Sequence, residues 1–261
     1  MRLTAPEKTR DFKALCKEAC RAVNKYDMLH DGDSVALGLS GGEDSLMLMH
    51  VMEFLRRRGK VAFSLHPVTV DMSFATFDIQ SLLDYCQRQG WELNVVKFDG
   101  QSLITGKGQE DQPCAICSRL RRGQIHRFAD EQHCNVLALG HHLDDVCVSF
   151  LMSLFHGGGL KTMGPNVPAD SGSKRLIRPF CLLPKSMIHA AAVNFDLPKV
   201  KSCPYEEQLA ANGDRAYLER LLITLEEQFP HLRQAMLHSL GDVRLQHLFD
   251  LNLKRLLAER E

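Results

Sequence analysis

The chain has 261 residues, of which 44% are hydrophobic and 25% charged, a balance that excludes an intrinsically disordered protein. Its 32 Lys and Arg residues equal its 32 Asp and Glu residues, which argues against a surface that is basic all over and binds nucleic acid non-specifically. Nine scattered cysteines, an odd number, argue against a disulfide framework and favour thiols in a reducing compartment.

The N-terminal segment is charged throughout and carries no apolar leader, and no window approaches the roughly 18 apolar residues of a membrane-spanning helix. We therefore expect a cytoplasmic protein that makes no membrane contact.

Hydrophobic periodicity predicts alternating helices and strands. In chain order we expect a helix over 8–29, a strand over 34–40, a helix over 44–58, a strand over 62–71, a helix over 76–89, a strand over 91–98, a loop over 99–113, a helix over 115–132, a strand over 135–140, a helix over 143–156, a Gly-rich loop over 157–174, and helices over 185–195, 206–228 and 231–259. This alternation is typical of an α/β fold with a doubly wound parallel sheet. We divide the chain into an N-terminal helical segment (1–30), a central domain (31–200) and a C-terminal helical extension (201–261).

A Gly-rich turn follows the first predicted strand. It reads Ser40, Gly41, Gly42, Glu43, Asp44 and Ser45. Two glycines allow a tight turn, and backbone amides at the start of the next helix can bind phosphate. A plain strand-to-helix turn capped by Asp44 and Ser45 is the alternative.

This turn resembles the SGGxDS signature of the PP-loop ATP pyrophosphatases. The resemblance implies that these residues bind ATP and that the end of the second strand, Val70 and Asp71, contacts adenine, although Asp71 could equally be a turn residue. Several relatives carry Lys at the x of the signature, where this chain has Glu43. A carboxylate there repels phosphate unless it points away or helps to hold Mg²⁺.

A pair of cysteines, Cys114 and Cys117, lies at the start of the predicted helix over 115–132. A CxxC pair can bind a metal, form a redox couple or occur by coincidence. Cys203 is a third candidate ligand, and three thiolates would leave one iron of an iron–sulfur cluster open.

The order of motifs resembles the TtcA-type tRNA 2-thiocytidine synthetases over roughly residues 30–210. The matching segments are 40–45, 114–123, 138–145, 155–158, 163–165, 177–179 and Cys203. The resemblance implies a 4Fe-4S cluster on Cys114, Cys117 and Cys203, and ATP-dependent thiolation of cytidine 32 in tRNA. The family often shows PCxxC at the third ligand, whereas this chain retains only its first cysteine. The other six cysteines are expected in the core.

The segment Gly140, His141, His142, Leu143, Asp144 and Asp145 joins the fourth strand to a helix. Acids in a first helical turn are favourable in any protein. The resemblance places Gly140 and His141 at ATP, and implies that an acid of this segment, for which we favour Asp145, holds Mg²⁺ or positions the substrate base. We expect Asp44, Cys114 and Cys117 to be catalytic with it.

Basic residues concentrate near the proposed cluster. Residues 173–201 contain six cations and one acid, Asp196. We expect RNA contacts from Arg119, Arg121, Arg122, Arg178, Lys199 and Lys201.

The sequence therefore predicts an ATP-dependent iron–sulfur tRNA thiolase, with tRNA and a cysteine desulfurase or another sulfur donor as partners and a homodimer as a possible assembly. The alternatives are a tRNA 2-thiouridine synthetase, a PP-loop protein that binds nucleotide or tRNA without catalysis, and a zinc-containing nucleotide ligase.

Overall fold

The computed structural model describes residues 4–105, 113–169, 174–200, 213–251 and 255. The strands are β1 (Asp33–Gly38), β2 (Phe63–Asp71), β3 (Asn94–Lys97), β4 (Val136–Ala138), β5 (Asn166–Pro168) and β6 (Arg175–Ile177). The α-helices are α1 (Arg10–Lys25), α2 (Glu43–Arg58), α3 (Ile79–Gln89), α4 (Gly100–Thr105), α5 (Pro113–Glu131), α6 (Leu143–Phe155), α7 (Lys185–Ala192), α9 (Asp214–Gln228) and α10 (Leu232–Gly241). Two short 3₁₀ helices span Pro6–Lys8 and Leu245–His247.

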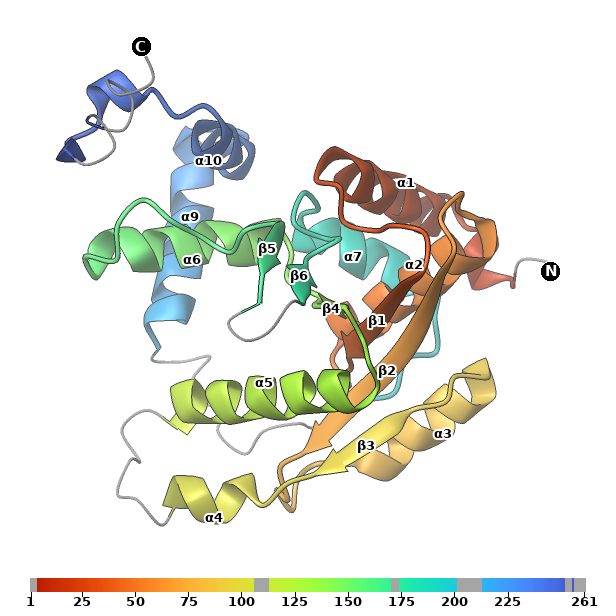
Figure 1. The fold of residues 1–261 in the computed structure, drawn as a ribbon. Helices are drawn as coiled ribbons and strands as arrows, with labels where there is room; N and C mark the ends of the chain where they lie inside the picture. The colour runs from red at the N-terminus through yellow and green to blue at the C-terminus, as the bar shows by residue number, and fades with distance from the viewer. Residues whose placement is uncertain (1–3, 106–112, 170–173, 201–212, 252–254, 256–261) are drawn as a thin grey trace.

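The six strands form one sheet in the order β3-β2-β1-β4-β6-β5, and every pair is parallel except β5 with β6 (Figure 1). The chain runs from β1 outward to β2 and β3 and then returns to place β4 on the other side of β1. The gap between the ends of β1 and β4 is therefore the point where the strand order reverses. In open α/β sheets, ligands bind at this point.

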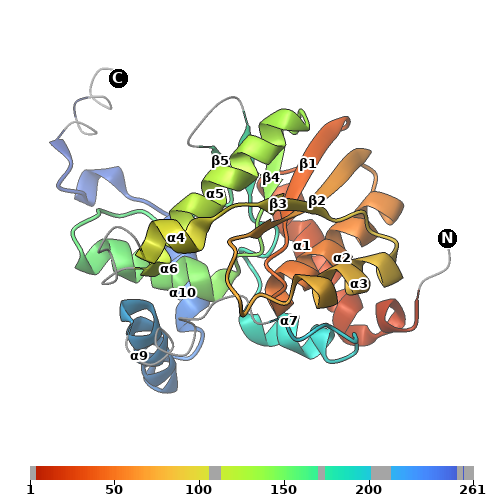
Figure 2. The same cartoon turned by 90° about the horizontal axis from the view of Figure 1, so that it is seen from below.

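Alternate residues of the central strands face two different cores, as the two-residue period of a strand requires. Val35 and Leu37 of β1 belong to the larger core, and Ala36 between them belongs to the smaller one. Figure 2 shows α5 on one side of the sheet and α1, α2, α3 and α7 on the other. The sheet is thus covered on both faces, which confirms the predicted doubly wound α/β class.

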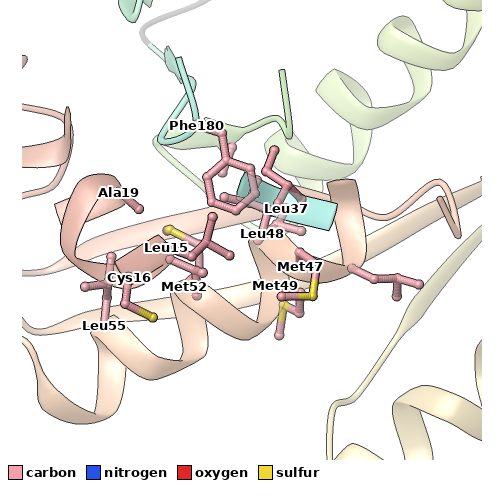
Figure 3. Close-up of a cluster of buried hydrophobic side chains, with 14 of the residues drawn as sticks. Leu15, Cys16, Ala19, Leu37, Met47, Leu48, Met49, Met52, Leu55 and Phe180 are labelled. Atoms are coloured by element: carbon pink, nitrogen blue, oxygen red, sulfur yellow. The ribbon is translucent and has the colours of Figure 1, made fainter. Parts of the chain in front are cut away.

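The larger core joins α1 to the helix that follows β1. Leu15 and Ala19 of α1 pack with Leu48 and Met52 of α2, and Phe180 closes the cluster (Figure 3). Thr9 caps the N-terminus of α1, because its hydroxyl accepts a hydrogen bond from the Phe12 amide at 3.3 Å. These contacts hold α2 firmly, and its N-terminus with it.

The structure differs from the sequence predictions in five places. The expected loop over 99–113 begins with the six-residue helix α4, the Gly-rich loop over 157–174 contains β5, and β6 lies where no strand is predicted. The sheet is not wholly parallel, because β5 is antiparallel to β6. The helix expected over 231–259 stops at Gly241. Strands of three residues and a helix of six are too short to show a hydrophobic period.

A third small core attaches the C-terminal helices. Leu218 and Leu222 of α9 pack on Leu143, Cys147 and Val148 of α6. α6 begins directly after the end of β4, so α9 and α10 lie beside the reversal point of the sheet. No helix among the described residues is long and apolar enough to cross a bilayer.

A buried histidine makes the stability of this fold sensitive to acid. His50 of α2 is 5% exposed, lies 2.6 Å from the Tyr85 hydroxyl through its Nε2, and packs on Trp91 and Phe195. Burial lowers its pKa from 6.5 to about 3. The unfolded chain takes up this proton near pH 6.5 and the folded chain does not, so acid favours unfolding.

We expect the free energy of unfolding to fall by roughly 1.4 kcal/mol per pH unit below pH 6.5 because of His50 alone. Urea denaturation between pH 7.5 and 5 measures this slope. H50Q should flatten it, whereas H238Q, at an exposed position of α10, should leave it unchanged. An H50Q slope as steep as the parent's would contradict the prediction.

Candidate functional site

A cavity of about 520 Å³ opens at the reversal point of the sheet, within the size range of small-molecule sites. Three strand ends form its walls, with α5 above them. Its lining residues are Gly38, Leu39, Ser40, Asp44, Ser45, Val68, Thr69, Val70, Phe77, Cys117, Ser118, Arg121, Arg122, Ile125, Leu139, Gly140, His141 and Asp145. The cavity therefore joins the three motifs that the sequence singled out: the Gly-rich turn, the CxxC helix and the His-His-Leu-Asp-Asp segment.

The Gly-rich turn is held in shape by the two serines at its ends. The Ser40 amide donates to the Ser45 hydroxyl at 3.2 Å, and that hydroxyl donates to the Gly42 carbonyl at 2.9 Å. Gly41 has φ +85°, a left-handed conformation that glycine adopts without strain. A Cβ on Gly41 would also lie 2.7 Å from Val200. The turn thus leads the chain into α2 with the first amides of the helix at the cavity, a suitable place for phosphate.

A second glycine brings the other motif against this turn. A Cβ on Gly140 would lie 3.2 to 3.3 Å from backbone atoms of Asp44 and Ser45. Such a contact is tighter than most real Cβ contacts, so a residue with a side chain would push the end of β4 and the first turn of α2 slightly apart. His141 and Asp145 consequently lie in the same cavity as Asp44 and Ser45.

The first turns of α2 and α6 form a compact ionic cluster around His142. Its Nδ1 lies 3.2 Å from Asp144, and its Nε2 lies 3.4 Å from Asp145 and 3.8 Å from Asp44. Burial alone would lower the pKa of His142, but its interactions with the accepting Asp144 carboxylate and with the other nearby carboxylates hold that pKa above its usual value. The imidazole balances part of the negative charge of the three acids.

His141, by contrast, is kept neutral. Burial lowers its pKa to about 4, against the opposing effect of Asp145. Its Nδ1 accepts a hydrogen bond from Nε of Arg178 at 3.3 Å. This hydrogen bond from Arg178 holds the His141 ring in position at the cavity wall.

Two arginines from the C-terminal helices complete the cluster, and the sequence analysis missed both. Arg215 of α9 donates from Nη2 to Asp145 at 2.8 Å. Arg233 of α10 is 7% exposed and pairs with Asp144 at 3.1 Å and Glu219 at 2.7 Å, and also with Glu226. No sequence signal marks either residue, because each lies about seventy to ninety positions from its acid on α6 and the helices carry ordinary surface charge patterns.

The structure places the cysteines only in part. Cys117 is buried on α5 and lines the cavity. Cys114 lies one turn earlier in the same helix, but its side chain falls outside the described residues, as does the whole of Cys203. Of the other six cysteines, five are buried in the cores and Cys20 is partly buried.

Predicted ATP contacts divide into those at the cavity and those away from it. Ser40, Asp44, Ser45, Val70, Gly140 and His141 line the cavity. Gly41 and Gly42 shape the turn behind it. Asp71 is the last residue of β2, its carboxylate accepts a hydrogen bond from the Ser73 amide at 2.9 Å, and it is not among the residues that line the cavity. Glu43 also points away from the cavity, toward α7.

The expected basic surface is only partly present. Arg119, Arg122 and Lys199 are exposed, and Lys201 lies outside the described residues. Arg121 lines the cavity, and its buried Nε has no hydrogen-bond partner within the described chain, so a ligand there could bind it.

Arg178 corrects the prediction of an RNA contact. Only 8% of it is exposed, and its guanidinium bonds to the Gly164 carbonyl and His141 inside the protein. The cations of segment 173–201 do not form one surface either, because Lys174 pairs with Asp130, Arg175 with Asp33, and Lys185 with Asp44. Consecutive residues of a strand and the loop after it point to different parts of the protein.

The chain is similar to known proteins over most of its length. Residues 8–202 match the family model of the PP-loop domain. A tRNA-cytidine(32) 2-sulfurtransferase from Geobacter sulfurreducens is 36% identical over 247 residues, covering 94% of this chain and 95% of that protein. One from Syntrophotalea carbinolica is 34% identical over 244 residues, covering 93% and 94%.

Among solved structures, the fold is similar to that of the U34-tRNA thiolase NcsA from Methanococcus maripaludis, determined with its 4Fe-4S cluster. The TM-score is 0.70 at 23% sequence identity, over 89% of this chain and 81% of that one. At this identity the likeness shows a shared fold.

Alanine substitution at each of the two adjacent glycines should show which of them the conformation of the turn requires. We expect G41A to lose most ATP binding, because a left-handed alanine is strained by roughly 1–2 kcal/mol and its Cβ would collide with Val200. G42A should bind ATP nearly as the parent does, because Gly42 has φ −76° and its Cβ would meet only the Ser40 hydroxyl at 3.4 Å. Calorimetric titration with ATP measures both, and equal affinities for the two variants would contradict the role assigned to Gly41.

Removal of the buried arginine should detach the C-terminal helices. We expect R233M to lower the free energy of unfolding by roughly 3–5 kcal/mol, because Asp144, Glu219 and Glu226 would lose their shared counter-ion. Urea denaturation measures the change, and R220M, at an exposed site of α9, is the control. A loss below 1 kcal/mol would show that the cluster does not hold the helices.

Proposed function

The chain belongs to the tRNA-cytidine(32) 2-sulfurtransferase family of PP-loop proteins, and from this premise we propose that it replaces the C2 oxygen of cytidine 32 in tRNA by sulfur in an ATP-dependent reaction. The observation that carries this proposal is the convergence of the Gly-rich turn, Asp145 and Cys117 on one cavity. A nucleotide-binding turn alone would serve many reactions, but a thiol in the wall beside it fits sulfur transfer.

ATP would lie with its phosphates at the start of α2 and its base toward the end of β2. The amides of the Gly-rich turn and the hydroxyls of Ser40 and Ser45 would bind the phosphates, and Val70 would contact adenine. Arg121 offers its unpaired Nε at the same wall. Asp44 and Asp145 are oxygen donors of the kind that Mg²⁺ prefers, and they would hold it together with the phosphates.

Activation would convert a poor leaving group into a good one. The C2 oxygen of the cytosine attacks the α-phosphorus, the bond to the β-phosphate oxygen breaks, and pyrophosphate leaves. A sulfur nucleophile then adds at C2 and AMP departs with the original oxygen. The site supports this sequence by placing cations and amides where the phosphate charge changes.

The donor set fits a 4Fe-4S cluster on Cys114, Cys117 and Cys203. Cys117 lies in the cavity wall, and the backbone of Cys114 lies one turn earlier in α5. When bound, such a cluster would supply sulfur at an iron that no protein thiolate ligates. Sulfur would reach it from a cysteine desulfurase or another donor in the cytoplasm.

RNA must approach over the open side of the cavity. Arg119 and Arg122 are exposed on α5 beside Cys117, and Lys199 is exposed close to the Gly-rich turn in the chain segment that contacts Gly41. These charges can bind the phosphate backbone, while a splayed cytosine enters the cavity. A homodimer remains part of the proposal, as does the division of the chain at residues 30 and 200.

The proposal is tested by the nucleosides of tRNA. Cells lacking the gene should lose 2-thiocytidine, and the parent gene should restore it. C114S, C117S or C203S should each abolish the modification and reduce bound iron after anaerobic purification, while C20S, at a partly buried position on α1, should change neither. Mass spectrometry of digested tRNA and iron analysis measure these outcomes.

Three results would overturn parts of the proposal. Unchanged 2-thiocytidine in the deletion strain would refute the substrate. A loss of 2-thiouridine in its place would identify the uridine enzyme. Full iron and full thiolation in the cysteine variants would refute the cluster.

A further inference from the structure

The first turn of α2 carries two adjacent acids at the place where we propose that ATP phosphates bind. Asp44 lines the cavity, and Glu43 precedes it as the first residue of α2. Two carboxylates beside a polyphosphate repel it in a cavity of reduced dielectric. Unless a cation offsets them, they weaken the binding that the helix N-terminus provides.

Mg²⁺, which we propose that Asp44 helps to hold, would offset part of this charge, and the structure supplies a further cation from a distant part of the chain. Lys185, the first residue of α7, donates from Nζ to Asp44, and the same Nζ lies 3.6 Å from Glu43. The other carboxylate oxygen of Glu43 lies 3.0 Å from Nδ1 of His189, one turn further along α7. Glu43 thus turns its side chain away from the cavity to the face of α7 that carries Lys185 and His189.

The backbone fixes where this ammonium lies. The Lys185 amide donates to Asp144 at 2.7 Å, and Ile188, Ala191 and Ala192 bury α7 in the larger core. The side chain itself is 42% exposed, and ion pairs with that exposure contribute little to stability. The position of Lys185 is therefore explained better by its effect on the charge at the cavity than by a contribution to folding.

We propose that Lys185 is a positioning residue for the phosphates of ATP, which offsets the charges of Glu43 and Asp44 and orients the Asp44 carboxylate at the cavity. Glu43 and Lys185 form a charge pair across two helices: the acid lies in the first turn of α2, and α7 supplies the cation. The pair acts through Asp44 and the local field, without direct contact to the reacting atoms. This inference rests on the proposed binding of ATP in the cavity.

If this charge pair supports ATP binding, reversing the charge at position 43 should compensate for reversing the charge at position 185. We expect K185E to raise the dissociation constant of ATP roughly tenfold or more, because three carboxylates would then lie at the first turn of α2 with no ammonium to offset them. The double variant E43K/K185E should return to within about threefold of the parent, and E43K alone should bind ATP at least as well as the parent. K185Q should fall between the parent and K185E.

Calorimetric titration of the full-length, anaerobically purified protein with ATP and Mg²⁺ measures these constants. K60E is the matched control, since it makes the same charge change at an exposed position beyond the other end of α2. Adenosine, which has no phosphates, should bind all variants equally. Thermal melting checks that each variant is folded, and K185Q keeps the test open if K185E is not.

The outcomes separate this inference from the proposed function. A parent protein that binds no ATP refutes the function on which the inference rests. A parent that binds ATP, with K185E and K185Q equal to it, refutes the inference alone. Failure of E43K to correct K185E, or an equal loss of adenosine binding, also overturns it.

Discussion

The approach of two strand-to-helix turns at the centre of the sheet determines the rest of the site. Gly140 at the end of β4 lies against the backbone of Asp44 and Ser45 at the start of α2, so closely that a Cβ there would make an unusually tight contact. This contact brings the acids of two helix N-termini, Asp44 and Asp145, into one cavity. Carboxylates so close together need counter-charges, and the surrounding helices provide them.

Three different parts of the chain supply these counter-charges. His142 lies between the acids, Lys185 reaches Asp44 from α7, and Arg215 reaches Asp145 from α9. Arg233 anchors the C-terminal pair of helices to Asp144. The match to the PP-loop domain ends at residue 202, yet two of these cations come from beyond it. The C-terminal helices are therefore part of the electrostatics of the site as well as a cover for α6.

Local patterns in the sequence predicted the two strand-to-helix turns of the site but not the ion pairs that surround them. Gly41, Ser45 and Asp145 were identifiable because their motifs follow buried strands, and the sheet then had to bring them together. Arg215 and Arg233 gave no such signal, since an arginine on an amphipathic helix is usually solvated. The basic segment over 173–201 misled for the converse reason: Lys174 and Arg178 are close in sequence, but each is buried against a different partner. Local sequence patterns therefore predict the conformation of a backbone segment better than they predict which charged side chains will pair.

The buried cysteines bear on chemical selectivity. Burial raises the pKa of Cys86 to about 11 and those of Cys147 and Cys181 to about 12, and it also raises the pKa values of Cys16 and Cys134. At neutral pH these thiols keep their protons, and a protonated, enclosed thiol is a poor nucleophile and a poor acceptor of persulfide sulfur. In a protein proposed to carry reactive sulfur, the buried thiols of the core are therefore poorly suited to accept that sulfur in side reactions.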